Sequence, residues 1–283
     1  MTRATSRCRK RPSVKRLPAS AAPGERLHKV LARRGLGSRR TIEAWIAAGR
    51  ISVNGETARL GSVIRPGDAV RVDGQALDPT HLFAETRRVI AYYKPSGEVC
   101  TRSDPDGRRS VFEALPALAT GRWVSVGRLD LTSSGLLLFT TDGALAHRLM
   151  HPASEVEREY LVRVLGTVSE TVMKNLLAGV ALEDGWARFD TVEARGGTGA
   201  NQWFAVVLRE GRNREVRRLW ESQGLRVSRL MRIRYGPIVL ARERRPGASW
   251  DLSQREVEQL LASVEGDRRH PAQHPLRAGR QPI

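Results

Sequence analysis

A carboxylate between two glycines is the first candidate for chemistry in this sequence. Residues 127–135 read Gly-Arg-Leu-Asp-Leu-Thr-Ser-Ser-Gly, after one apolar run and before another. Glycine lets the backbone bend sharply, so we expect Asp130 to be presented at a turn and not paired within a sheet. A presented carboxylate can act as a nucleophile or a general base. An Asp before Thr-Ser-Ser can also simply cap a turn, and the spacing alone favours that interpretation.

Two other arrangements of reactive groups carry less weight. His147 and His151 have the spacing of metal ligands on a helix, but no Glu follows the first His and a proline ends the helix at once, which favours capping or packing. Asp130 could pair with Asp142 or Glu159 as the two carboxylates of a glycosidase do. Asp142, however, lies in an Asp-Gly turn signature. We therefore expect neither a metal site nor glycoside hydrolysis.

Arginine dominates residues 209–234. Nine arginines there accompany three acidic residues, and apolar side chains are interleaved with them. A salt-bridged surface explains only part of this excess, because three acids cannot neutralise nine arginines. Arginine has the planar fork that suits phosphate and base contacts. We expect these residues to line a phosphate-binding wall, with one side of an RNA channel formed by Arg226, Arg229, Arg232 and Arg234.

Composition points to the same kind of partner. The chain has 283 residues, with 48 Lys and Arg against 30 Asp and Glu, a net charge of +18 and a pI near 11.2. Such a charge favours a polyanion, above all nucleic acid. Cys8 and Cys100 have no disulfide-framework or zinc spacing, which fits a reducing cytoplasm, and no apolar stretch approaches the roughly 20 residues that span a bilayer. We expect a cytoplasmic protein without a membrane partner.

Four regions follow from the composition and periodicity. Residues 1–23 have seven basic residues and no acid, which predicts a disordered basic arm. Residues 24–86 form a small module and linker, residues 87–253 a larger mixed α+β domain, and residues 254–283 a helix followed by a basic tail. In the larger domain we expect strands at 89–93, 123–126, 135–140, 160–165, 203–208 and 238–241, and helices at 144–150, 169–177 and 215–222.

The small module has a compact pattern of its own. Apolar residues from Leu27 predict one short helix, Ser38 caps a second that ends at Gly49, and Ile51, Val63 and residues 70–72 read as a strand ribbon. Its order of motifs resembles the helix-plus-hairpin RNA-binding module shared by a ribosomal protein, a tRNA synthetase and several RNA-modifying enzymes. That resemblance implies RNA contacts from Arg33, Arg34, Arg39, Arg40 and Arg50.

The larger domain resembles the uridine-to-pseudouridine isomerases. The match consists of Gly-Arg-Leu-Asp at 127–130, a Gly-Leu-Leu strand and Asp-Gly after it, together with Tyr-Lys-Pro at 93–95, Glu-Arg-Glu-Tyr at 157–160 and the arginine-rich block at 210–218. The resemblance implies that Asp130 is the nucleophile, that Tyr160 contacts the base and that Arg217 is the basic partner of the Asp, with Arg212 and Arg214 as alternatives.

This resemblance also implies a fold and a reaction. The fold class is α+β: the small RNA-binding module, followed by a mixed, mainly antiparallel sheet that carries catalysis. Isomerisation breaks the glycosidic bond of a uridine and rejoins the base through carbon-5, which requires no cofactor. The motifs between residues 218 and 236 resemble the enzymes of large-subunit ribosomal RNA, so we expect that RNA or its precursor particle as partner of a monomeric protein. Further RNA contacts are expected from Arg128, Arg212, Arg214, Arg229 and Arg232.

Two other functions are compatible with parts of the sequence. A noncatalytic RNA-binding or ribosome-assembly factor would explain the charge, but it would not need Asp130, Tyr160 and Arg217 together. A base-releasing nucleosidase would use a similar carboxylate, and its abasic product would distinguish it from an isomerase.

Overall fold

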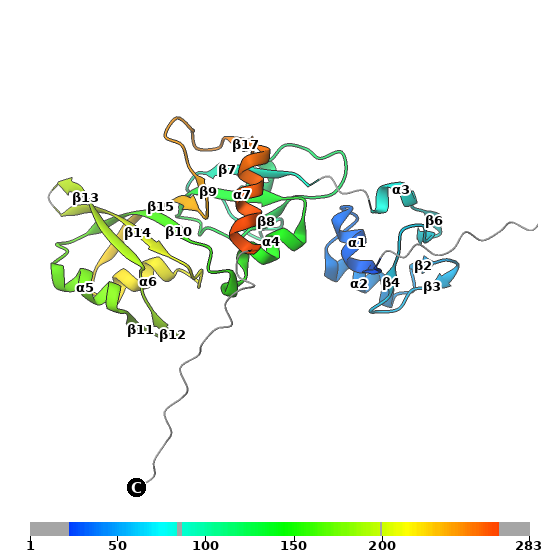
Figure 1. The fold of residues 1–283 in the computed structure, drawn as a ribbon, viewed down its shortest axis with the longest axis horizontal. Coiled ribbons are helices and arrows are strands. Elements are labelled where there is room, and N and C mark those ends of the chain that lie inside the picture. Colours follow the sequence, from blue (N-terminus) through cyan, green and yellow to red (C-terminus); the bar gives the residue numbers. More distant parts are fainter. Residues whose placement is uncertain (1–22, 84–86, 199, 266–283) are drawn as a thin grey trace, which may run out of the picture. The chain divides into compact units, whose positions relative to one another are not determined.

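The computed structural model describes residues 23–83, 87–198 and 200–265. The chain divides into two compact units, Met1–Glu85 and Thr86–Ile283 (Figure 1). The predicted basic arm, except its last residue, and the predicted tail beyond residue 265 lie outside the described residues. Among the described helices, none combines the length and apolar character needed to cross a bilayer.

The first unit is built as the sequence predicts, from two helices and a small ribbon. Helix α1 (Leu27–Arg33) and helix α2 (Arg39–Ala47) pack together, and the Ser38 hydroxyl accepts the Thr41 amide at 3.0 Å as the N-cap of α2. The remaining elements are β1 (Glu25–Arg26), β2 (Ile51–Val53), β3 (Glu56–Thr57), β4 (Val63–Ile64), β5 (Val70–Val72), β6 (Gln75–Ala76) and α3 (Pro79–Leu82).

The ribbon differs from the prediction in one strand. The four-stranded sheet has the order β3-β2-β5-β6, whereas β4 pairs with β1 in a separate two-stranded sheet, so Val63 is not part of the ribbon. The core of the unit contains Leu27, Leu31, Ile42 and Ile51, all fully buried. Burying such a side chain contributes about 1.5–3 kcal/mol, so α1, α2 and the ribbon are held mainly by this cluster.

The second unit contains a nine-stranded mixed sheet. Its main order is β13-β14-β10-β15-β9-β7-β17, with β16 paired to β15 and β8 paired to β9. Only the β9–β15 pair is parallel among the described pairs. The strands are β7 (Val89–Lys94), β8 (Val124–Val126), β9 (Ser134–Thr140), β10 (Arg158–Leu165), β13 (Thr191–Thr198), β14 (Asn201–Leu208), β15 (Arg226–Tyr235), β16 (Ile238–Val239) and β17 (Ser249–Asp251).

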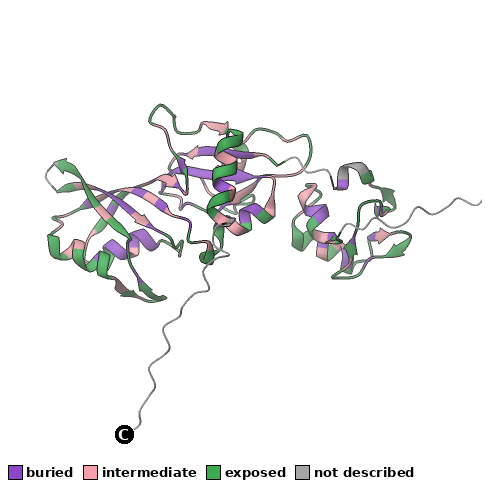
Figure 2. Ribbon diagram, in the orientation of Figure 1, coloured by how far each residue is buried: buried purple, intermediate pink, exposed green. Residues whose placement is uncertain are grey.

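Helices cover the two halves of this sheet on opposite faces. Helices α5 (Glu170–Ala178) and α6 (Glu215–Glu221) pack against the face of β10 and β14 that carries Val162 and Phe204. Helices α4 (Gly143–Met150) and α7 (Gln254–Glu265) pack against the other face, over β7 and β9. Figure 2 shows the buried residues concentrated along the strands between these layers. The remaining elements are the hairpin of β11 (Val180–Leu182) and β12 (Gly185–Ala187), and the short helices Val111–Ala114 and Pro152–Ser154.

Each strand and helix expected in this unit is present, but the ten-residue strand β15 was not expected. Alternation of apolar residues is the usual signal of a half-buried strand, and β15 lacks it because two bulges interrupt the pattern. Arg163 pairs with Arg229 while Val164 pairs with Val227, which leaves Ser228 unpaired. The extra residue changes the spacing of the core-facing side chains. The strand therefore has no regular alternation in the sequence, and its arginines do not indicate a central strand.

Candidate active site

Asp130 lies in the loop between β8 and β9, half-buried at the wall of a cleft. Two hydrogen bonds to backbone carbonyls hold the loop: the Gly97 amide donates to the Leu131 carbonyl at 2.8 Å, and the Cys100 thiol donates to the Leu129 carbonyl at 3.3 Å. Gly127 has a φ of 78°, which lets the chain turn as it leaves β8. Within the described part of the chain the Asp130 carboxylate has no ion pair and no hydrogen bond, so both oxygens are free for a ligand.

Lys94 holds the same loop from beneath. Its ammonium is fully buried at the end of β7 and donates to three carbonyls, those of Pro95 at 3.0 Å, Asp130 at 3.2 Å and Ser133 at 2.9 Å. These bonds use all three protons of the ammonium. Burial lowers the pKa of Lys94, and the charge of Asp130 is among those that oppose this change. Lys94 therefore fixes the loop backbone around Asp130 and places a positive charge nearby.

From the sequence, Lys94 was predicted only as part of a motif, without a role of its own. Its signal was present: it is one of five lysines in a chain where arginine supplies the other basic residues, and it ends an apolar strand directly before a proline. A lysine at the end of a buried strand requires partners, because an unpaired buried charge is costly.

Arg217 on α6 supports the loop from the opposite side. Its guanidinium is buried and donates to the Val227 carbonyl at 3.0 Å, to the Thr132 hydroxyl at 3.2 Å and to the Ser133 hydroxyl at 3.4 Å. Burial and the neighbouring Arg214 lower the pKa of Arg217, and the Asp130 carboxylate counteracts this. Arg217 thus links the arginine-rich block to the Asp130 loop by hydrogen bonds, and the charges of Arg217 and Asp130 interact.

Gly135 is required by the close approach of two strands. Strand β15 runs parallel to β9 with Arg232 opposite Gly135, and a Cβ added at Gly135 would lie 2.2 Å from the Arg232 carbonyl oxygen. The Arg232 side chain is buried, donates from Nε to the Leu136 carbonyl at 2.7 Å, and has an Nη2 without a partner among the described residues. The glycine after the Asp130 loop therefore brings a second buried guanidinium to the cleft.

The prediction that four arginines of β15 form one side of an RNA channel is wrong, because bulges in the strand place them on different faces of the sheet. These arginines are Arg226, Arg229, Arg232 and Arg234. Tyr160 pairs with Arg232 whereas Glu159 pairs with Arg234, so Ile233 is an extra residue and the two arginines point to opposite faces of the sheet. Arg232 lines the cleft with Tyr160, and Arg234 forms ion pairs with Glu157 and Glu159 on the other face. By the same register, Arg226 and Arg229 also lie on the face away from the cleft.

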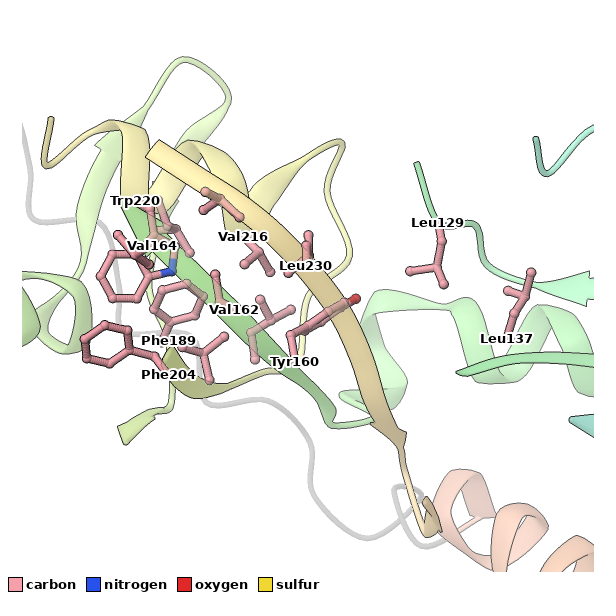
Figure 3. Packing of buried hydrophobic residues seen from close by; sticks show 14 of the residues in the cluster. Leu129, Leu137, Tyr160, Val162, Val164, Phe189, Phe204, Val216, Trp220 and Leu230 are labelled. Atoms are coloured by element: carbon pink, nitrogen blue, oxygen red, sulfur yellow. The ribbon is translucent and has the colours of Figure 1, made fainter. Parts of the chain in front are cut away.

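The cleft that contains Asp130 has a volume of about 1430 Å³. Tyr160 lies in its wall with 8% of its surface exposed, and Figure 3 shows the ring between the Phe189 and Phe204 side of the hydrophobic cluster and Leu129, with its hydroxyl directed away from Phe189 and Phe204. Six of the predicted site residues line this one cleft, although they come from four separate segments of the chain: Arg128, Asp130, Tyr160, Arg212, Arg214 and Arg232.

The three arginines at the rim differ in how they are engaged. Arg128 is exposed and has no ion pair in the described part of the chain. Arg212 donates to the Trp186 carbonyl at 2.8 Å and forms an ion pair with Glu210, which ties it to the β11–β12 hairpin. Arg214 is exposed and lies 3.7 Å from Glu221. Among the described residues, neither Arg212 nor Arg214 forms a hydrogen bond or ion pair with the Asp130 loop, whereas Arg217 bonds to Thr132 and Ser133.

In the first unit, the predicted RNA-binding arginines are divided between structural contacts and open surface. Arg33 forms an ion pair with Glu25, Arg34 donates to the Leu82 carbonyl, and Arg50 forms an ion pair with Asp73. Arg39 and Arg40 are exposed on α2.

The two discounted signals have structural roles. The His151 ring accepts the Ala153 amide at 3.2 Å, which caps a short helix, and among the described residues no group of three metal-binding side chains is present. Asp142 is the N-cap of α4 and accepts the amides of Ala144 and Leu145 at 2.8 and 3.1 Å. Asp142 therefore has a structural role, as the cap of α4.

Comparison with known proteins agrees with both parts of this description. Residues 88–222 match the RNA pseudouridylate synthase family and residues 25–70 match the S4 domain. The chain is similar to a solved structure described as a pseudouridylate synthase, with a TM-score of 0.58 and 27% identity, covering 83% of this chain and 99% of that one.

Curated relatives share more of the sequence, and three of them, each named ribosomal large subunit pseudouridine synthase B, show how much. The relative from Pseudomonas aeruginosa is 56% identical over 85% of this chain and 63% of its own length, so the match spans less than two thirds of that protein. The relative from Haemophilus influenzae is 54% identical over 92% of this chain and 73% of its own length, and the one from Escherichia coli O6:H1 is 52% identical over 89% and 92%. The predicted family is thereby confirmed: this chain belongs to the RNA pseudouridylate synthases, among the relatives of the large subunit synthase B proteins.

Proposed function

We propose that this protein isomerises a uridine of large-subunit ribosomal RNA to pseudouridine, with Asp130 as the nucleophile. The observation that carries the proposal is the Asp130 carboxylate itself, half-buried in the cleft wall with no partner among the described residues. The loop that presents it is fixed by the buried cations of Lys94 and Arg217. A fixed loop with an unpaired carboxylate is suited to attack on a bound substrate, because positioning it costs nothing at the moment of reaction.

The reaction rearranges one base on its own sugar. The bond between N1 and the ribose C1′ breaks, the base turns, a bond forms between C5 and C1′, C5 loses its proton and N1 gains one. Atoms and electrons balance without a redox partner, so the proposal includes no cofactor. The Tyr160 ring, at the cleft wall, offers an extruded base a surface for stacking, and Arg232 adds an unpartnered donor close to it.

The substrate assignment follows the relatives. Their names specify the large ribosomal subunit, and the S4 match together with the cationic first unit supports RNA as the partner. We propose large-subunit RNA or its precursor particle as substrate, and a single copy of the chain as the active species. The domain limits predicted from the sequence, with catalysis within residues 87–253, are part of this proposal.

Mapping pseudouridines in ribosomal RNA from cells with and without this gene tests the substrate. We expect one or more gene-dependent sites in large-subunit RNA, and gene-dependent sites confined to small-subunit RNA or transfer RNA would contradict the assignment.

The Asp130→Asn variant tests the nucleophile in vitro. We expect it to form no detectable pseudouridine while binding the RNA as tightly as the parent, because the substitution keeps the side-chain shape. Turnover within tenfold of the parent would remove Asp130 from the central role.

A further inference from the structure

Among the described residues of the second unit, one part of the sheet face away from the cleft is not covered by a helix. Over β10, β14 and the first part of β15, α5 and α6 pack against the cleft side only, whereas α4 and α7 cover β7 and β9. The strand register places side chains of the uncovered face in rows, one of which is Trp203, Arg163 and Arg229, and the next Asn201, Leu165 and Arg226. Neither hydrophobic cluster of the second unit includes Trp203 or Leu165; Trp203 is half-buried and Leu165 is exposed.

Three arginines on this face have no acidic partner in the described part of the chain. Arg226 and Arg229 are exposed, and Arg163 is half-buried. The Arg163 side chain is held in place, since Nε donates to the Ser228 hydroxyl at 2.9 Å and the guanidinium lies 5.8 Å from the centre of the Trp203 ring. Ser228 is the residue that the bulge inserts into β15. The bulge therefore both turns Arg229 away from the cleft and positions Arg163 beside the tryptophan.

The opposite end of the same face is acidic. A cavity of about 500 Å³ there is lined by Glu157, Glu159, Asp190 and Glu193, and its two arginines, Arg209 and Arg234, are already paired with Glu157. A polyanion on this face would be repelled at the acidic end and attracted at the arginine end. The charge distribution thus limits an anionic partner to the rows that contain Trp203, Arg163 and Arg226.

The topology around these rows is one that binds RNA elsewhere. Apart from the β11–β12 hairpin inserted between α5 and β13, the chain runs through β10, α5, β13, β14, α6 and β15 as a β-α-β-β-α-β unit. Its sheet order is β13-β14-β10-β15, and α5 and α6 lie on one face. Four-stranded sheets with this pattern can recognise single-stranded RNA by stacking bases on aromatic side chains of the open face. Trp203 stands on such a face, on the strand next to the central strand β10, with guanidinium groups beside it.

We propose that this open face binds a single-stranded segment of the same RNA whose uridine enters the cleft. Trp203 stacks one base, and Arg163, Arg226 and Arg229 contact phosphates of the adjoining backbone. This inference rests on the proposed function for the identity of the RNA. Single-stranded RNA fits the surface better than an acidic protein segment, because a planar ring beside a guanidinium offers a stacking surface as well as charge.

The test uses the full chain and a large-subunit RNA stem that the protein converts, with and without oligoadenylate extensions. We expect the extensions to tighten binding to the parent protein. The Arg226→Gln/Arg229→Gln variant loses two phosphate contacts. Its affinity for the extended RNA should therefore fall less steeply with salt, with the slope of log affinity against log salt smaller in magnitude by about 1.4. Its binding of the unextended stem should not change. Trp203→Ala should weaken binding of the extended RNA by about 5- to 100-fold.

A matched control removes two exposed arginines elsewhere on the same unit. The Arg242→Gln/Arg255→Gln variant loses the same charge and should bind the extended RNA as the parent does. Equal losses in both double variants, or no loss in either, would overturn the proposal. The Arg226→Gln/Arg229→Gln variant could instead bind the extended RNA normally and convert RNA more slowly only in precursor particles that contain ribosomal proteins. That result would assign the face to a protein partner and would also overturn the proposal. If the parent converts no stem, the proposed function fails, and the inference that rests on it fails too.

Discussion

At the scale of single residues, the Asp130 loop depends on two buried cations, Lys94 and Arg217. Lys94 makes three bonds to backbone carbonyls, and Lys94→Met would leave all three without a donor. We expect turnover to fall by about 100-fold because the carboxylate is no longer held in position, while RNA affinity is unchanged. Single-turnover assays and filter binding measure the two effects. Lys174→Met, which removes an exposed lysine on α5, is the control and should behave as the parent.

Arg217 is the second residue with a specific expectation. We expect Arg217→Ala to lower kcat strongly, because the Thr132 and Ser133 hydroxyls lose their donor and Asp130 loses a nearby cation. Arg217→Lys should not restore the rate, since one ammonium cannot replace a fork that bonds both Val227 and Thr132. Arg214→Ala should keep most of the activity. The reverse ranking of Arg217→Ala and Arg214→Ala in rapid-quench assays would identify Arg214 as the basic partner.

At the scale of elements, the carboxylate of Asp142 ties α4 to the end of β9. Burial acts to raise the pKa of Asp142, but the amides of Leu145 and Ala144 and the Arg87 guanidinium outweigh it, so the pKa lies below its ordinary value of 3.8. A carboxyl whose pKa is lower in the folded state stabilises the fold above pH 3.8, and this contribution is lost as the pH falls through the lower value.

Asp142→Ala should therefore lower the free energy of unfolding at pH 7 by about 0.5–2 kcal/mol, the range for loss of an N-cap. The difference between parent and variant should shrink as the pH is lowered below 3.8. Urea denaturation at a series of pH values measures this. A difference that is constant with pH would show that the cap acts through its shape and not through its charge.

At the scale of the whole molecule, the two units have separate cores, and we expect them to have separate tasks. If the exposed Arg39 and Arg40 of the first unit serve RNA binding alone, Arg39→Gln/Arg40→Gln will raise KM for the RNA and leave kcat unchanged. The slope of log RNA affinity against log salt concentration should become smaller in magnitude by about 1.4 to 1.8. Arg59→Gln/Arg65→Gln removes the same charge from the loops of that unit and tests whether the position on α2 matters. A lower kcat with an unchanged KM would contradict this division of labour.

Local signals in the sequence were sufficient for much of this protein. The Ser38 cap, the apolar strands around 89–93 and 135–140, and the turn at Gly127 act through neighbours in the chain, so their outcome is visible without tertiary structure. The family, too, was recognisable from short motifs in order. Their physical basis is that turns, caps and close approaches each permit few residue types.

Tertiary structure alone decided which arginines reach the cleft and what fixes Asp130. The two bulges in β15 depend on the register with β10, and a single inserted residue moves Arg234 to the face opposite Arg232. The three carbonyls around Lys94 come from two separate segments, as do the groups around Arg217. Sequence specifies the side chains, but the side of a sheet on which a charge lies is set by long-range strand pairing, which leaves no periodic trace where bulges interrupt it.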